Sequence, residues 1–104
     1  MPDPAEQLQR IYQAGFEVQQ LERYPRAVGV VRGNCIALLE SAPGGLRLVA
    51  TPGWRMGDVI GVLVERDGRQ VFQNKSNLVE ATPERLSELA RFRRELEQLL
   101  TPVA

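Results

Sequence analysis

The sequence predicts one α+β domain, residues 1–104, in which a short N-terminal helix and a longer C-terminal helix flank an antiparallel sheet of about five or six strands. Both ends of the chain carry apolar residues at helical spacing, and the middle carries apolar runs around the hairpin signals Gly33-Asn34 and Asp67-Gly68. Strands that cluster between helices favour an antiparallel sheet with both helices on one face. A small, partly closed β-barrel with flanking helices is the alternative.

Residues 4–14 are predicted to form the first helix. Leu8, Ile11 and Tyr12 recur at i, i+3 and i+4, which places them on one apolar face. Asp3 stands where an N-cap is expected, directly before a proline that suits the first helical position.

The clearest β unit is a hairpin in which residues 27–31 and 35–39 flank Gly33-Asn34. A two-residue loop that begins with glycine suits a type II′ turn. Both faces of this hairpin are apolar, so we expect it to be central in the sheet and covered on both sides. The loop length sets a register in which Val31 pairs with Ile36 and Val28 pairs with Leu39.

Further strands follow from turn signals and alternation. The Pro43-Gly44 turn leads into a third strand of the meander, residues 46–51. A second hairpin joins residues 59–66 to residues 69–75 through Asp67-Gly68. Its register pairs Val64 with Val71 and Leu63 with Phe72.

Two segments are less regular. Residues 16–24 are interpreted as an edge strand with Phe16 and Val18 pointing inward. Residues 52–57, which include Trp54, are interpreted as an irregular loop rich in glycine.

The last helix is predicted over residues 83–100, with Thr82 as its N-cap and a proline at its first position. Its apolar arc is wider than the roughly 100° stripe of an ordinary surface helix. One sheet face would cover part of this arc, and the first helix or a second copy of the chain must cover the rest. Because the first helix is only about three turns long, we expect the chain to self-associate through this surface. The candidate interface residues are Leu86, Leu89, Phe92, Leu96 and Leu100.

Composition argues against several classes of function. The chain has no histidine and one cysteine, so it lacks the usual metal ligands and the usual general acid–base residue. We expect no metal, no cofactor and no enzymatic activity. The 13 basic residues balance the 13 acidic residues, which disfavours nucleic-acid binding. The basic set holds a single lysine, Lys75, a bias typical of a GC-rich bacterial genome.

One small-molecule site is conceivable at the end of the second hairpin, around the only tryptophan. Its candidate residues are Trp54, Arg55, Asp58 and Lys75. The competing interpretation is that Trp54 plugs the core, since tryptophan is mostly buried on average. Cys35 is interpreted as a small buried hydrophobe rather than as a reactive thiol.

The N-terminus has neither a basic start nor an apolar run, so it does not resemble a signal peptide, and the lone cysteine fits a reducing compartment. The expected localisation is cytoplasmic, with no membrane span. The leading hypothesis for the function is a non-enzymatic protein-interaction or homodimerising module. A small-molecule-binding domain or weak enzyme that uses the Trp54 and Lys75 end of the sheet is the alternative.

Overall fold

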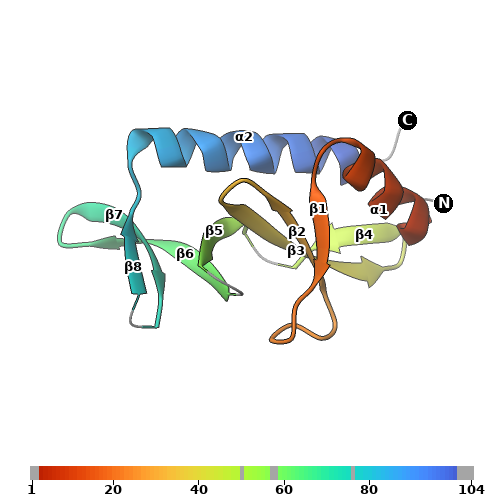
Figure 1. Ribbon diagram of the computed structural model, residues 1–104, viewed down its shortest axis with the longest axis horizontal. Helices are drawn as coiled ribbons and strands as arrows, with labels where there is room; N and C mark the ends of the chain where they lie inside the picture. Colours follow the sequence, from red (N-terminus) through yellow and green to blue (C-terminus); the bar gives the residue numbers. More distant parts are fainter. Residues whose placement is uncertain (1–2, 50, 57–58, 76, 101–104) are drawn as a thin grey trace.

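In the computed structural model, which describes residues 3–49, 51–56, 59–75 and 77–100, two helices flank an eight-stranded antiparallel sheet that curls into a half-barrel (Figure 1). The α+β class is confirmed, and the strand count is larger than predicted. The elements are α1 (Pro4–Gln13), β1 (Glu17–Gln20), β2 (Val28–Arg32), β3 (Cys35–Ala42), β4 (Gly45–Leu48), β5 (Gly53–Met56), β6 (Val59–Arg66), β7 (Arg69–Asn74), β8 (Asn77–Glu80) and α2 (Pro83–Leu100).

The extra strands are β5 and β8. The prediction of an irregular loop over residues 52–57 was wrong, because Gly53–Met56 pairs with both β3 and β6. Strand β8 was not predicted, and it pairs antiparallel with β7. Both strands have four residues, so neither is long enough to display a convincing alternation of apolar and polar side chains.

The central hairpin has the predicted register. Val31 pairs with Ile36 and Val28 pairs with Leu39, across a turn in which Gly33 has a φ of +61°. Alternate residues of β3 belong to two separate apolar clusters, so both faces of the hairpin are covered, as predicted. The main cluster includes Ile11 of α1 and three residues of α2, which places both helices on the same side of the hairpin. Those residues are Leu89, Phe92 and Leu96.

Strand β3 bends between two neighbours, which curls the sheet. Its first residues, Cys35 and Ile36, pair with β5, whereas residues 39–42 pair with β4. The strand order is therefore β1-β2-β3-β5-β6-β7-β8, with β4 pairing only with β3.

Helix α1 begins as predicted, since the Asp3 side chain accepts a hydrogen bond from the backbone N–H of Ala5 at 3.1 Å. Its inner face differs from the prediction. Ile11 is fully buried, but Tyr12 is 69% exposed and Gln7 occupies the buried position instead. The Gln7 Oε1 atom accepts a hydrogen bond from the backbone N–H of Leu46 at 2.7 Å, which satisfies this buried amide.

The edge strand β1 is shorter than the predicted segment. Phe16 is buried directly before the strand, as expected, and Val18 shares the inward face with its buried partner Val30, although it remains 36% exposed at the border of the sheet. As β1 pairs only with β2 and forms one border of the sheet, it is covered less completely than the central strands.

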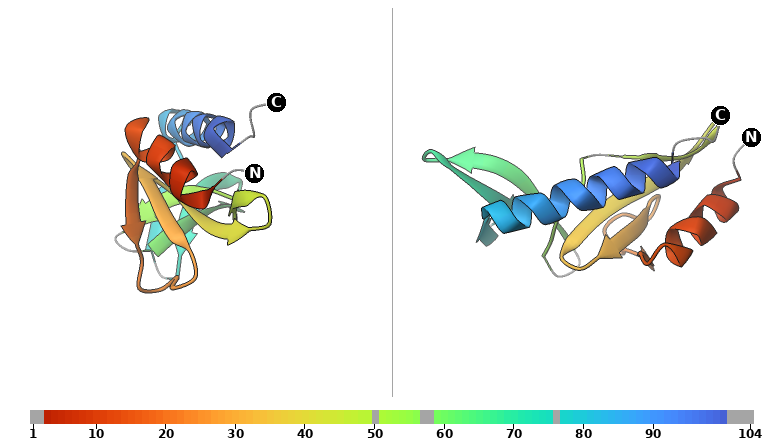
Figure 2. Two further views of the ribbon diagram at one scale, coloured as in Figure 1. Left: turned by 90° about the vertical axis from the view of Figure 1, so that its right-hand side faces the viewer. Right: turned by 90° about the horizontal axis from the view of Figure 1, so that it is seen from above.

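Helix α2 runs along the long dimension of the molecule, which measures 45 × 28 × 22 Å (Figure 2). The Oγ1 atom of Thr82 accepts a hydrogen bond from the backbone N–H of Arg85 at 3.3 Å, which confirms the predicted cap. Strands β6–β8 lie at the end of the molecule opposite α1 (Figure 1). Their hairpin has the predicted register, with Val64 opposite Val71 and Leu63 opposite Phe72.

Candidate functional site

Trp54 lies in the interior of the protein. Its side chain is 6% exposed, and its ring stacks on Phe72 with 5.0 Å between centroids and 10° between planes. The Arg85 guanidinium of α2 lies 5.9 Å from the centroid of the indole. This geometry agrees with the interpretation of Trp54 as a core plug and leaves little of the ring available to a ligand.

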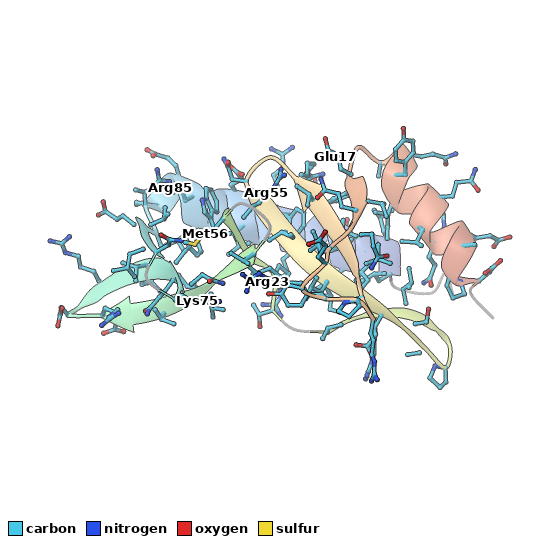
Figure 3. All side chains as sticks on the ribbon, turned by 60° about the horizontal axis from the view of Figure 1, so that its bottom comes forward. Glu17, Arg23, Arg55, Met56, Lys75 and Arg85 are labelled. Atoms are coloured by element: carbon cyan, nitrogen blue, oxygen red, sulfur yellow. The ribbon has the colours of Figure 1, made fainter. Side chains whose placement is uncertain are left out.

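Of the other residues of the predicted small-molecule site, the structure describes Arg55 and Lys75. The backbone N–H of Arg55 donates a hydrogen bond to the carbonyl oxygen of Asn34 at 2.6 Å, and its side chain is exposed. Lys75 is exposed in the turn between β7 and β8, with a φ of +49°. Figure 3 shows Arg55 and Lys75 apart from each other. Asp58 lies outside the described residues.

A polar hollow of about 440 Å³ separates the turn of the central hairpin from α2. Glu88 reaches this turn from α2, where its Oε2 atom accepts a hydrogen bond from the backbone N–H of Asn34 at 3.1 Å. The same oxygen lies 3.7 Å from the Sγ atom of Cys35. The hollow therefore contains a carboxylate and borders the only thiol, a pair that could in principle take part in chemistry.

The surroundings of the thiol suppress that chemistry. Cys35 is fully buried, and burial together with the negative charge of Glu88 and its hydrogen bond raises the pKa of the thiol from 9.0 to about 12. A thiol is nucleophilic only as the thiolate, so Cys35 is almost entirely unreactive near neutral pH. The structure agrees with its interpretation as a small buried hydrophobe.

The remaining charges of the hollow neutralise one another. Glu95 forms an ion pair with Arg32, and its second oxygen lies 3.5 Å from Arg91. The hydrogen bond from Arg32 is the main cause that holds the pKa of Glu95 below its usual value of 4.5. The Arg32 guanidinium also lies 4.3 Å from the centroid of the Phe16 ring. These contacts hold the central hairpin against α2, and we interpret the residues around the hollow as structural. We call this set of contacts the latch.

Strands β6–β8 present a different kind of surface on the side away from α2. Cross-strand partners share a face, and alternate residues of a strand point to the same side. Phe72 and Val79 point toward the main cluster, so the opposite face is the outward one. We call this surface the outer face. Its apolar members are Val62, Val64, Val71 and Leu78.

The outer face is the most exposed apolar surface on this sheet. Val62 is 58% exposed and Leu78 is 53% exposed, and both flank Gln73 in the same row of the sheet. Ile60 precedes Val62 by two residues on β6 and therefore points to the same side of the sheet, where it packs against the second apolar cluster. Several exposed apolar side chains on one sheet face are typical of a surface that binds another protein.

Charged residues surround this apolar centre. Arg66 and Arg69 lie directly opposite each other at the tip of the hairpin, and Glu80 lies opposite Val71 on β8. A hollow of about 440 Å³ opens here, with Val71 among the residues that line it. Its full lining is Arg66, Asp67, Arg69, Val71 and Leu78.

The interface residues that the sequence suggested lie on α2, on the other side of the sheet from the outer face. Leu89, Phe92 and Leu96 of α2 are at most 8% exposed, and Leu86 and Leu100 pack against the same cluster. The sheet and α1 of the same chain cover the wide apolar arc. The sequence contains a pattern that indicates the outer face. Strand β6 carries apolar residues at both odd and even positions, although the helices lie on only one side of the sheet.

Comparison of the chain with protein-family models found no match, and neither did comparison with curated proteins or with solved structures. Function must therefore be argued from the geometry of the chain itself. Within the described ranges, neither helix is long and apolar enough to cross a membrane.

Proposed function

We propose that this chain is a non-enzymatic protein-interaction module that binds its partner through the outer face of β6–β8. The observation that carries the proposal is the exposure of Val62 and Leu78, each more than half exposed and both on one sheet face. Burial of such side chains in a complex is favourable by about 25 cal/mol per Å² of apolar surface. The fully buried thiol of Cys35 fits a protein that works in the reducing cytoplasm.

The chemistry of the polar hollow supports a function without catalysis. A catalytic site usually holds groups whose pKa values are shifted toward neutral pH, where they exchange protons readily. Here the pKa of Cys35 is raised and that of Glu95 is lowered, so both shifts lead away from neutral pH. Each shift stabilises the protonation state that the group already has at neutral pH.

The proposal can be tested by cross-linking in the cell. A photoreactive amino acid at position 78 should form covalent adducts with the partner, because Leu78 lies on the outer face. The same amino acid at position 90 is the control, since Ala90 is exposed on α2, which packs against the opposite side of the sheet. Adducts at position 78 that are several times more abundant than at position 90 would support the proposal. Equal yields at the two positions would contradict it.

A further inference from the structure

The outer face carries charges of both signs around Val71. Arg69 lies two residues before Val71 on β7, and Glu80 is the direct partner of Val71 on β8. Arg69 is therefore about 7 Å from Val71 along the strand, and Glu80 is about 5 Å from Val71 across the sheet. A two-fold axis that runs parallel to the face, passes through Val71 and bisects the directions to Arg69 and Glu80 would place Arg69 of one copy close to Glu80 of the other.

The charges at this end of the sheet lack a full set of partners inside the chain. Arg66 and Arg69 oppose each other in the pair that closes the hairpin, an arrangement that is unfavourable for like charges. Arg66 reaches across the face and donates a hydrogen bond from Nη1 to Gln73 Oε1 at 3.1 Å. Among the described residues, Arg69 and the Glu80 carboxylate form no ion pair. A carboxylate from outside would relieve the repulsion between the two arginines.

We infer that the occupant of the outer face is a second copy of this chain, docked face to face about a two-fold axis near Val71, an inference that rests on the proposed function. Val71 and Val62 of each copy then meet their own counterparts near the axis, at the spacing of about 10 Å that is usual for stacked sheets. Arg69 of each copy pairs with Glu80 of the other. The formal net charge of zero leaves no net repulsion between copies, and two-fold dimers are the commonest symmetric assembly.

The size of the face sets the strength of the dimer. Three strands about 4.8 Å apart and five residues at about 3.4 Å each give a flat footprint of roughly 250 Å². Stable interfaces bury about 800 Å² on each partner, so this one is at the small end even after allowance for protruding side chains. We therefore expect a reversible dimer with a dissociation constant in the micromolar range or above.

A charge exchange tests the inference by sedimentation equilibrium of the full chain. Arg69→Glu alone and Glu80→Arg alone should each weaken dimerisation at least tenfold, because each creates two like-charge contacts across the interface. A mixture of the two variants should dimerise about as well as the wild type, since both contacts then join opposite charges. Arg93→Glu on the exposed side of α2 is the control and should leave dimerisation unchanged. Circular dichroism of each variant establishes that the fold is intact.

Two results would overturn the inference. One is a wild-type chain that remains monomeric at the highest soluble concentration. The other is a mixture of charge variants that dimerises no better than either variant alone. Neither result would overturn the proposed function, because cross-linking at position 78 would still reveal a different partner by the mass of its adduct. Conversely, if each charge variant alone dimerises weakly and their mixture dimerises like the wild type, the second copy is identified as the partner.

Discussion

Cys35 is the only thiol of the chain, which makes its ionisation directly measurable. Burial and the neighbouring Glu88 carboxylate raise its pKa from 9.0 to about 12. We predict that the folded protein does not react with a thiol-specific dye at pH 8, whereas the protein unfolded in urea reacts completely. The folded state holds the proton more tightly, so this group stabilises the fold below pH 9 and that contribution is lost as the pH rises toward 12. Rapid labelling of the folded protein would contradict the assigned environment.

Trp54 provides a second measurement on a single residue. Its ring is buried against Phe72, so its fluorescence should be blue-shifted and resistant to a soluble quencher. Phe72→Leu removes the stacking contact, which is worth about 0.5–1.5 kcal/mol beyond the buried area, and should shift the emission toward red. Lys75→Ala is the matched control in the same hairpin and should leave the emission unchanged. A metabolite that shifts the wild-type emission would revive the small-molecule site at this end of the sheet.

Individual side chains were predictable where the local pattern alone determines their position. Asp3 and Thr82 cap their helices because a short polar side chain before a proline is the usual start of a helix. Tyr12 and Gln7 were not predictable in the same way. The periodicity of α1 placed Tyr12 inside, but the backbone of β4 offered Gln7 a hydrogen bond there. That partner lies 39 positions away in the chain, so no local pattern could reveal it.

At the scale of elements, α2 depends on burial against the sheet of its own chain. Leu96 is fully buried in the main cluster. We predict that Leu96→Ala lowers the free energy of unfolding by about 2–5 kcal/mol, the usual range for a buried leucine. Urea denaturation followed by circular dichroism measures the change. Gln98→Ala, at an exposed position of the same helix, should change it by less than about 0.5 kcal/mol. Similar effects of the two substitutions would place α2 outside the core.

The latch between α2 and the central hairpin should depend on pH. Arg32 lowers the pKa of Glu95, so the ionised carboxylate stabilises the fold at neutral pH. This contribution is present above pH 4.5 and is lost as the pH falls below it toward the lowered pKa. We predict that Glu95→Gln is less stable than the wild type at pH 7 and that the difference shrinks below pH 4. In a thermal-unfolding series, a difference that does not change with pH would contradict the role of this ion pair.

A double-mutant cycle isolates the same contact. Arg32→Gln together with Glu95→Gln should cost less than the sum of the single substitutions, because each single change already breaks the ion pair. Additive costs would show that the two side chains act independently.

Hairpins were the most predictable elements, because a two-residue loop fixes the register of both strands. The registers of both predicted hairpins were confirmed residue by residue. The segment Gly53–Met56 was missed as a strand because its four residues are too few for a convincing alternation, although it pairs with Cys35 and Ile36 of β3 and with the nearby start of β6. The apolar arc of α2 looked too wide for one chain because the curl of the sheet around it could not be foreseen.

The whole molecule is longer than an average domain of its length. The radius of gyration of its Cα atoms is 14.1 Å, whereas a compact domain of about 100 residues has about 13 Å. The extra length comes from the β6–β7 hairpin, which extends beyond the start of α2 at one end of the molecule (Figure 2). A sheet that projects from the core leaves one of its faces without a covering layer, and this is the origin of the outer face.

The shape of the dimer follows from the position of the outer face at one end of the long axis. Two copies joined there overlap over a small part of their length, so the dimer should be far longer than the 45 Å of one copy. Copies joined along α2 would instead keep nearly that length and become thicker. Small-angle X-ray scattering across a concentration series should show the maximum dimension rising well beyond 45 Å as the dimer forms. Arg69→Glu places like charges opposite each other across the interface and should hold the maximum dimension at the monomer value at every concentration. A wild-type dimer whose maximum dimension stays close to that of the monomer would place the contact along α2 and exclude the outer face as its site.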